Sequence, residues 1–443
     1  MRRFVTTAIA AVIIVAIGVF AWRTFNPGPL AFARGPTVAL AEYQGANPTG
    51  VPVGLAKADI VKRGEYLAKA ADCMVCHTAK DGAAFAGGLP FPAPSGTLYS
   101  TNITADKDTG IGNYSDQDFL NAVQRGIRKD GARLYPAMPY TSYTFMTDAD
   151  VLAIKAYLLS LPAVHRPNEG DTLKFPYNQR WSMMPWSWAF NPNTRFAPNT
   201  AKSAEWNRGA YVAEALAHCG ECHTPRNSAF GLDNRRKFAG AAYGWLAYNI
   251  TSDKGTGIGS WSDEEVFTYL AKGHTTGRGT ASGPMGEVVD HSLSLIEPAD
   301  IRALVTYLRS IPAVASPQPA TIAPPAPASP KEGGAVADTL GGKVFAQACV
   351  SCHSWTGVSA ISPFATISGS RAVNDPSATN VAQIVISGTR RFTPGGLSMP
   401  AFGSTYTDTE IAAVANYVTG RFGSDASKLT AMDVAQLRDQ TAR

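Results

Sequence analysis

The sequence has few charged residues and no cluster of basic ones. Charged residues make up 16% of the chain, against roughly 25% in an average globular protein. Lysine plus arginine exceeds aspartate plus glutamate by only 39 − 34 = 5, so nothing indicates a nucleic-acid partner. Disorder along the whole chain is excluded because 45% of the residues are hydrophobic. The repeats of collagen and of coiled coils are also missing.

No cysteine lies outside three Cys-x-x-Cys pairs, so none is left over for a separate disulfide. The pairs, each with the histidine that follows it, are Cys73, Cys76 and His77; Cys219, Cys222 and His223; and Cys349, Cys352 and His353. Cys-x-x-Cys-His is the attachment motif of c-type haem, in which both thiols bond to the porphyrin and the histidine binds the iron. Zinc usually needs a further Cys or His pair, and a thioredoxin-like pair does not need the histidine. The sequence therefore predicts three covalently bound haem c groups.

The segments around the first two motifs are copies of each other. The sequence KRGEYL at 62–67 is matched by NRGAYV at 207–212. The tripeptide Asn-Ile-Thr at 102–104 recurs at 249–251, an offset of 249 − 102 = 147 residues. A third, shorter copy begins at Gly342. Such self-similarity indicates three duplicated domains.

Each copy predicts helices. The start of one helix per copy is marked by a capping box, at Ser115-x-x-Asp118, Ser262-x-x-Glu265 and Thr407-x-x-Glu410. The last helix of each copy carries apolar residues at helical spacing: Val151, Ile154, Tyr157 and Leu158; Ile301, Leu304, Tyr307 and Leu308; and Ile411, Val414, Tyr417 and Val418. No stretch alternates with the period of a strand, so we expect an all-α fold.

The N-terminus carries a long apolar segment. No charged residue occurs from Phe4 to Trp22, a run of 22 − 4 + 1 = 19 residues, close to the roughly 20 that cross a bilayer as a helix. We expect an uncleaved transmembrane helix; the alternative is a removed signal peptide, whose apolar region is about 7–15 residues long. Because Arg2 and Arg3 favour a cytoplasmic N-terminus, the body is expected on the periplasmic side of the bacterial inner (cytoplasmic) membrane.

Two connecting segments differ in composition. Residues 311–330 are rich in proline and alanine, which favours an extended spacer. Residues 166–205 instead carry large aromatic side chains, among them Phe175, Tyr177, Trp181, Trp186, Trp188, Phe190 and Phe196. Two interpretations stay open: these residues hold the first two copies together, or they dock a partner subunit or the membrane surface. The tail from Ser424 onward is expected to be a frayed, solvent-facing helix. The alternative is a weak amphipathic contact made by Leu429, Met432 and Leu437.

A methionine occupies a corresponding place in each copy and is a candidate for the sixth iron ligand. These residues are Met138, Met285 and Met399, each ahead of the last helix of its copy and next to proline or glycine. Methionine also fills apolar cores, but its neighbours here predict a fixed loop. His274 and His291 flank Met285, so ligation by two histidines is the alternative in the second copy. A coordinated sixth position indicates electron transfer, because it blocks small substrates.

The sequence resembles the three-haem cytochrome c subunit of membrane-bound bacterial dehydrogenases, the group that serves alcohol, aldehyde, gluconate and related sugar dehydrogenases. The resemblance extends over roughly residues 55–425 and is carried by residues 203–211, 218–227 and 102–104 and by the order of the three motifs. It implies iron ligation by His77 with Met138, His223 with Met285, and His353 with Met399. It also implies a partner dehydrogenase with a quinone, flavin or molybdenum cofactor, and electron delivery to ubiquinone or a terminal oxidase.

The expected architecture is three tandem class I cytochrome c domains after an N-terminal transmembrane helix. The expected segments are the N-terminal anchor or signal at 1–25, domain 1 at 55–165, an aromatic-rich connector at 166–205, domain 2 at 206–312, a Pro/Ala-rich linker at 313–334, domain 3 at 335–425 and a C-terminal tail at 426–443. The expected role is non-enzymatic: an electron-transfer subunit with no catalytic residue of its own. A free-standing carrier is the first alternative. A haem peroxidase is the second, and a methionine candidate in every copy argues against it.

Overall fold

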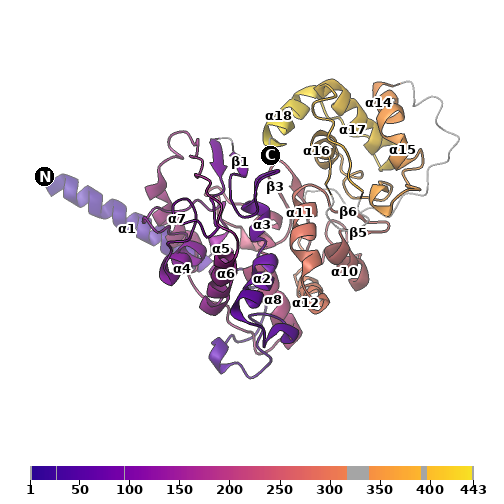
Figure 1. Cartoon of the computed structure of the whole chain (residues 1–443). Helices are drawn as coiled ribbons and strands as arrows, with labels where there is room; N and C mark the ends of the chain where they lie inside the picture. Colours follow the sequence, from indigo (N-terminus) through magenta and orange to yellow (C-terminus); the bar gives the residue numbers. More distant parts are fainter. Residues whose placement is uncertain (1, 26, 94, 317–338, 391–396, 442–443) are drawn as a thin grey trace.

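Three helical units follow one another along the chain in the computed structural model (Figure 1). The structure describes residues 2–25, 27–93, 95–316, 339–390 and 397–441, with side chains of the first helix described only at 9–22. Most of the predicted linker at 313–334 lies outside the described residues. Ahead of unit one come helix α1 (Arg2–Phe25) and the short helices η1 (Leu40–Glu42) and η2 (Val53–Leu55).

Each unit begins with a helix that leads into a Cys-x-x-Cys turn and ends with a longer helix. Unit one contains α2 (Ile60–Ala70), α3 (Cys73–Cys76), β1 (Pro90–Ala93), β2 (Gly96–Tyr99), α4 (Asp116–Arg125), α5 (Tyr140–Tyr143) and α6 (Asp148–Ser160). The connector contains η3 (Arg180–Ser182) and α7 (Met183–Phe190). Unit two contains α8 (Ala204–Tyr211), η4 (Val212–Leu216), α9 (Gly220–His223), η5 (Asn234–Arg236), β3 (Ala241–Ala242), β4 (Leu246–Ala247), α10 (Asp263–Lys272), β5 (His274–Thr275), β6 (Gly279–Thr280), α11 (Pro284–His291), η6 (Leu293–Leu295) and α12 (Pro298–Arg309). Unit three contains α14 (Leu340–Ala348), α15 (Val350–His353), η8 (Pro363–Ala365), α16 (Thr379–Ser387), α17 (Asp408–Phe422) and α18 (Ala431–Thr441).

The predicted capping boxes are confirmed. At the starts of α4, α10 and α17, the hydroxyl of the N-cap residue accepts a hydrogen bond from the backbone N–H three residues on, and the carboxylate there accepts one back. These reciprocal bonds satisfy two N–H groups that have no partner inside the helix. The predicted last helices are α6, α12 and α17, and their apolar stripes face the core.

A glycine lets the first and last helices of each unit cross in close contact. A Cβ atom at Gly64 in α2 would lie 1.9 Å from the carbonyl oxygen of Ala153 in α6. The same holds for Gly209 against Ala303, at 1.9 Å, in unit two. In unit three, a Cβ at Gly341 would lie 2.1 Å from the carbonyl oxygen of Ala413. No other residue type fits at this crossing, so the three glycines fix how each pair of helices packs.

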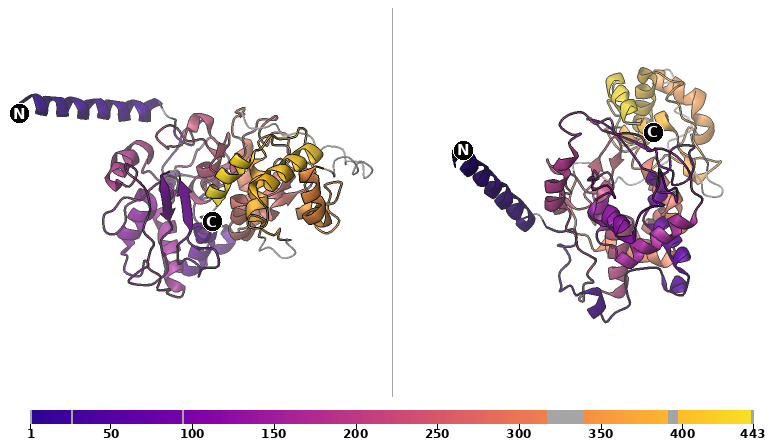
Figure 2. Two further views of the ribbon diagram at one scale, coloured as in Figure 1. Left: turned by 90° about the horizontal axis from the view of Figure 1, so that it is seen from above. Right: turned by 60° about the vertical axis from the view of Figure 1, so that its left-hand side comes forward.

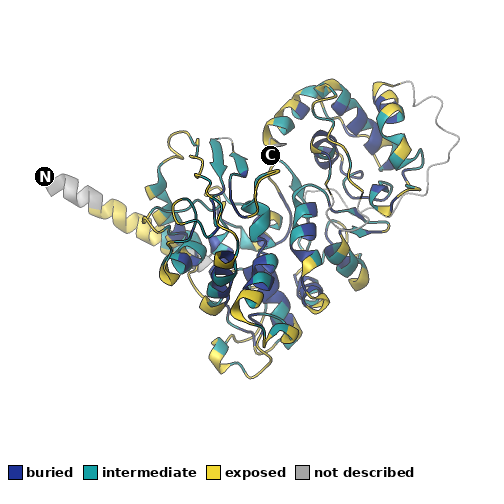
Figure 3. Ribbon diagram, in the orientation of Figure 1, coloured by how far each residue is buried: buried dark blue, intermediate teal, exposed yellow. Residues whose placement is uncertain are grey.

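Units one and two share a single hydrophobic core, and two reciprocal hydrogen bonds join them. Tyr66 of unit one donates to Asp300 of unit two at 2.6 Å, and Tyr211 of unit two donates to Asp150 of unit one at 2.5 Å. Arg208 adds an ion pair to Asp300 at 2.5 Å. The two tyrosines and the two aspartates of these bonds are buried, and the ribbon of the helices in this part of the molecule carries long stretches coloured as buried (Figure 3). The first two copies therefore form one packed body.

Unit three has a core of its own, and the end of the chain belongs to it. In α18, Val434 is fully buried against this core, and Arg438 pairs with Asp408 of α17 at 2.5 Å. The expectation of a frayed, solvent-facing tail is therefore wrong. Its apolar residues were visible in the sequence, but the surface that covers them is formed by helices from the same unit.

The prediction that residues 1–25 form a transmembrane helix is also wrong. The segment does form a helix, α1, which projects away from the body (Figure 2). However, among the residues that the structure describes, no helix combines the length and apolarity that crossing a membrane requires.

The all-α expectation needs a second correction, because three short antiparallel hairpins occur in the first two units. They are β1 with β2, β3 with β4, and β5 with β6. Each of their strands has at most four residues, which is too short to show a period of two in the sequence. The helical class otherwise holds, since helices form the cores.

Some aromatic residues of the connector hold the first two units together, and others are exposed and remain candidates for docking. Phe196 is buried and packs edge-on against Tyr211 of unit two at 5.4 Å, and the indole of Trp186 donates to the carbonyl of Ala229 at 2.6 Å. These residues hold the first two units together. Phe175 and Trp181 are instead 79% and 71% exposed, so the docking role stays a prediction for them.

Candidate functional site

Each Cys-x-x-Cys-His motif forms one turn of helix, at α3, α9 and α15. In every turn the backbone N–H of the histidine donates to the carbonyl of the first cysteine: His77 to Cys73 at 3.1 Å, His223 to Cys219 at 3.0 Å, and His353 to Cys349 at 3.0 Å. In the part of the chain that the structure describes, no two of the six cysteines are joined in a disulfide. One turn therefore presents two thiols and an imidazole together, which is the donor set that attaches a c-type haem.

The three histidines have the same hydrogen-bond partner, a backbone carbonyl. Nδ1 lies 2.7 Å from the oxygen of Thr101 for His77, 2.6 Å from that of Tyr248 for His223, and 2.6 Å from that of Ala365 for His353. Because a carbonyl only accepts, the proton sits on Nδ1 and the lone pair on Nε2. This is the tautomer that an iron ligand needs, and a carbonyl partner is the usual means of fixing it. The residues therefore fit haem iron.

Burial shifts the pKa of these imidazoles and of the first thiol of each pair in opposite directions. Burial lowers the pKa of His77, His223 and His353, and for His223 the positive charge of Arg371 lowers it further. Burial also raises the pKa of Cys73 and Cys219 to about 12. Burial likewise raises the pKa of Cys349, to about 11.

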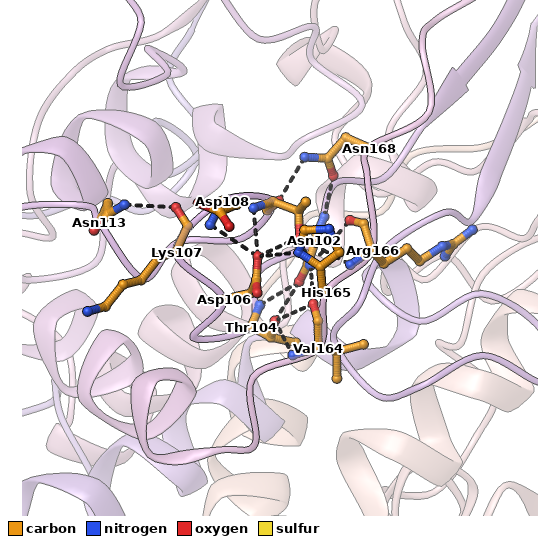
Figure 4. A network of polar contacts seen from close by, with 11 residues as sticks. Asn102, Thr104, Asp106, Lys107, Asp108, Asn113, Val164, His165, Arg166 and Asn168 are labelled. Atoms are coloured by element: carbon orange, nitrogen blue, oxygen red, sulfur yellow. Dashed lines mark hydrogen bonds and ion pairs between the residues drawn. The ribbon is translucent and has the colours of Figure 1, made fainter.

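The repeated Asn-Ile-Thr motif shapes the loop that supplies the carbonyl in units one and two. The side-chain oxygen of Asn102 accepts from the N–H of Thr104 at 2.9 Å, and its amide donates to the carbonyl of Val164 at 2.8 Å (Figure 4). Asn249 makes the corresponding bonds to Thr251, at 2.8 Å, and to Val314, at 2.7 Å. Each asparagine directly follows the residue whose carbonyl holds the histidine, so its bonds position that carbonyl. The sequence revealed the repeat but not this role.

The methionines predicted as iron ligands are all half-buried, and each packs against the same core as a haem-motif cysteine. Met138 and Met285 lie against the core shared by units one and two, as do Cys73 and Cys219. Met399 lies with Cys349 against the core of unit three. The loop prediction is wrong for Met285, which lies in the first turn of α11 after Pro284. Helix α11 still precedes the last helix of its unit, as expected.

The remaining histidines have other surroundings. The imidazole of His274 lies 2.9 Å from the hydroxyl of Thr280 and 5.5 Å, centre to centre, from the ring of Phe364 in unit three. His291 lies at the end of α11, and burial lowers its pKa. His218 is half-buried and its ring contacts Tyr143 of unit one at 5.4 Å. His274 therefore belongs to the contact between units two and three.

The first two Cys-x-x-Cys turns are tied together through α5 of unit one. Glu221, between the two cysteines of the second turn, accepts from the hydroxyls of Thr141 at 2.8 Å and Ser142 at 2.9 Å. The next residue, Tyr143, donates to the carbonyl of Ala71 at 2.6 Å, two residues ahead of the first turn. Sequence reasoning missed these residues because the bonds join positions far apart in the chain.

Comparison with known families agrees with this geometry. The cytochrome c family model matches residues 61–162, and the model described as cytochrome C oxidase, cbb3-type, subunit III matches residues 337–418. Together with the helical units and the three turns, these matches define a c-type cytochrome, a class that binds haem covalently.

Similarity to individual proteins extends over most of the chain. The fructose dehydrogenase cytochrome subunit of Gluconobacter japonicus is 38% identical over 89% of this chain and 85% of its own length. The gluconate 2-dehydrogenase cytochrome c subunit of Pantoea cypripedii is 38% identical over 87% of this chain and 91% of its own length. The cytochrome c subunit of alcohol dehydrogenase (quinone) from Gluconobacter oxydans (strain 621H) is 34% identical over 86% and 82%. The chain belongs to the family of dehydrogenase cytochrome c subunits.

Proposed function

We propose that the chain binds three haem c groups and passes electrons between them from a partner dehydrogenase. The observation that carries the proposal is the threefold recurrence of one arrangement: a Cys-x-x-Cys turn whose histidine gives Nδ1 to a backbone carbonyl. It is present in unit two, which neither family model matches, as well as in units one and three. This recurrence supports a count of three.

The residues of each unit have separate tasks in this proposal. The two cysteines hold the haem covalently, and the histidine binds its iron through Nε2. Met138, Met285 and Met399 would supply the further ligand of each iron, which would then not be open to small substrates. When bound, the haem supplies an iron that is reduced and oxidised by one electron. The chain fixes where each iron lies and adjusts its potential, and it needs no catalytic residue for this task.

The packing of units one and two supports transfer between their haems. Glu221 and Tyr143 link the two turns through direct hydrogen bonds, and both side chains are buried. Rigid spacing keeps the tunnelling distance constant and limits reorganisation of the surroundings. The reciprocal Tyr–Asp hydrogen bonds between the two units also hold these units at a fixed spacing.

The partner and the acceptor are proposed from the relatives. They are cytochrome subunits of fructose, gluconate and alcohol dehydrogenases, so we propose a dehydrogenase subunit with a quinone, flavin or molybdenum cofactor as the donor. Ubiquinone in the membrane or a terminal oxidase is the proposed acceptor. We place the complex on the periplasmic side of the bacterial inner membrane. Two arginines ahead of an apolar segment support export of the chain.

Purification of the chain from its native membranes tests the partnership. The proposal predicts that a dehydrogenase subunit co-purifies in a fixed ratio and that its substrate reduces the haems of this chain. A preparation that carries its haems but contains no stoichiometric dehydrogenase would contradict the proposal and favour a free-standing carrier. Fractionation of the cells checks the location, because the proposal requires the chain on the periplasmic side.

A further inference from the structure

A buried arginine from unit three contacts the loop of unit two whose backbone carbonyl holds His223, the predicted iron ligand of that unit. The guanidinium of Arg371 lies over the ring of Tyr248 in unit two, 4.5 Å from its centre. It donates to the carbonyl of Asn249 at 3.2 Å and also to the carbonyl of Thr256. Arg371 itself is only 9% exposed. A cation this deeply buried is costly unless its surroundings are fixed to receive it.

Tyr248 connects this arginine to the second haem site. Its backbone carbonyl lies 2.6 Å from Nδ1 of His223, and its hydroxyl donates to Asp375 of unit three at 3.1 Å. Unit three is held on the same loop by Asn380, which bonds to both the N–H and the carbonyl of Leu246, at 2.9 and 3.0 Å. The residue that orients His223 is therefore enclosed by unit three.

Unit one offers a matched comparison within the same chain. Thr109 corresponds to Thr256 at the offset of 256 − 109 = 147 residues. The carbonyl of Thr109 accepts from the side-chain amide of Asn168 at 2.9 Å, and Asn168 also accepts from the N–H of Asn102 at 2.7 Å (Figure 4). The carbonyl of Thr109 in unit one is thus bonded by a neutral amide, whereas the equivalent carbonyl of Thr256 is bonded by a guanidinium. Unit one does have a guanidinium near its loop, that of Arg166, but it donates to the carbonyl of Gly87 and is paired with the carboxylate of Glu169.

We propose that the positive charge of Arg371, a residue of unit three, raises the midpoint potential of the haem that Cys219, Cys222 and His223 would hold. Reduction of that haem adds one electron and makes the site more negative by one charge. A fixed positive charge close by stabilises the reduced form, and the effect is large where water is excluded. The carboxylate of Asp375 interacts with Arg371 and offsets part of its effect. This inference rests on the proposed function, since it requires a haem in unit two.

Spectroelectrochemical titration of the full-length protein tests the inference. In Arg371→Gln, one of the three midpoints should fall, so that the ferric-to-ferrous ratio of that haem at a fixed potential rises several-fold. Arg371→Lys should keep most of the wild-type midpoint because it keeps the charge. Asp375→Asn should move the same midpoint upward, and it serves as a second variant if Arg371→Gln folds poorly. Asn168→Ala is the matched control on unit one and should leave this midpoint unchanged.

The haem content of every variant is measured first, by intact mass, which separates this inference from the proposed function. Wild-type protein without a haem on unit two would refute the proposed function. Haem-loaded Arg371→Gln with all three midpoints unchanged would overturn the inference alone. Arg371→Lys with the same fall as Arg371→Gln would also overturn it, because charge would then not be the cause.

Discussion

At the scale of single residues, the orientation of the histidines is the most consistent feature of the chain. Three backbone carbonyls receive Nδ1 at 2.6–2.7 Å and leave Nε2 for the iron. The motif alone predicted that each histidine binds iron, since five adjacent residues carry that information. It could not identify Thr101, Tyr248 or Ala365 as partners, because a backbone carbonyl leaves no mark in a sequence. The repeated Asn-Ile-Thr was the only signal near two of them.

Replacement of Met285 tests the sixth ligand of the second haem. We expect Met285→Ala to lower one midpoint potential by on the order of 0.1 V, within the range of roughly 0.8 V that axial ligands span, because the soft thioether is lost. A potentiometric titration followed in the visible spectrum measures this change. Met146→Leu is the control, since Met146 is a fully buried core residue and not a ligand candidate.

Unchanged midpoints in Met285→Ala would exclude Met285 as a ligand. His291 would then be the better candidate, because His274 is held by Thr280 and Phe364 in the contact with unit three.

At the scale of the helices, local sequence signals predicted where helices begin, but they did not predict where an inserted residue is accommodated. Capping boxes and apolar stripes lie within a few residues of each other, so the helices that begin at Asp116, Asp263 and Asp408 could be placed from sequence. The π-helix η4 could not. Gly209 follows Gly64 by 209 − 64 = 145 residues, but Cys219 follows Cys73 by 219 − 73 = 146. The π turn at Val212–Leu216 absorbs that one extra residue within the helix.

The crossing of first and last helices gives a stability prediction. Gly209→Ala places a Cβ atom 1.9 Å from the carbonyl oxygen of Ala303, so α8 and α12 must move apart. We expect a loss of about 1–3 kcal/mol in the free energy of unfolding, or more, because the core around the crossing is opened. Denaturant unfolding followed by circular dichroism measures it. Gly54→Ala is the control, since nothing lies within 4 Å of a Cβ at that exposed position.

An unfolding midpoint for Gly209→Ala that equals that of Gly54→Ala would show that the two helices do not need the close contact.

At the scale of the whole molecule, the three copies do not form three independent bodies. Units one and two share one core, and unit three has another. The sequence repeat predicted the three units but not their pairing. The bond from Tyr66 to Asp300 joins residues 234 positions apart, and no local pattern announces such a contact. The transmembrane helix was also predicted at this scale, and the described part of the chain contains no helix long and apolar enough to cross a membrane.

Calorimetry tests the pairing of the units. We expect two unfolding transitions, one for units one and two together and one for unit three, because cooperativity follows the shared core. Tyr66→Phe should lower the temperature of the first transition alone. The free energy of unfolding of units one and two should fall by about 1.5–3 kcal/mol, because a hydrogen bond to a carboxylate is lost. Tyr177→Phe, at an exposed position of the connector, should change neither transition.

Three separate transitions, with Tyr66→Phe affecting only the one assigned to unit one, would show that the first two units fold independently.

The number of haems is the most direct test of the account. Mass spectrometry of the intact, purified chain measures it, together with the same measurement on a variant with Cys219 and Cys222 both replaced by serine. With a haem on each unit, the polypeptide mass is increased by three haem groups in the wild type and by two in the variant, and the reduced spectrum has a sharp alpha band. A wild-type mass with two added haems that the double substitution leaves unchanged, or with none, would contradict this count.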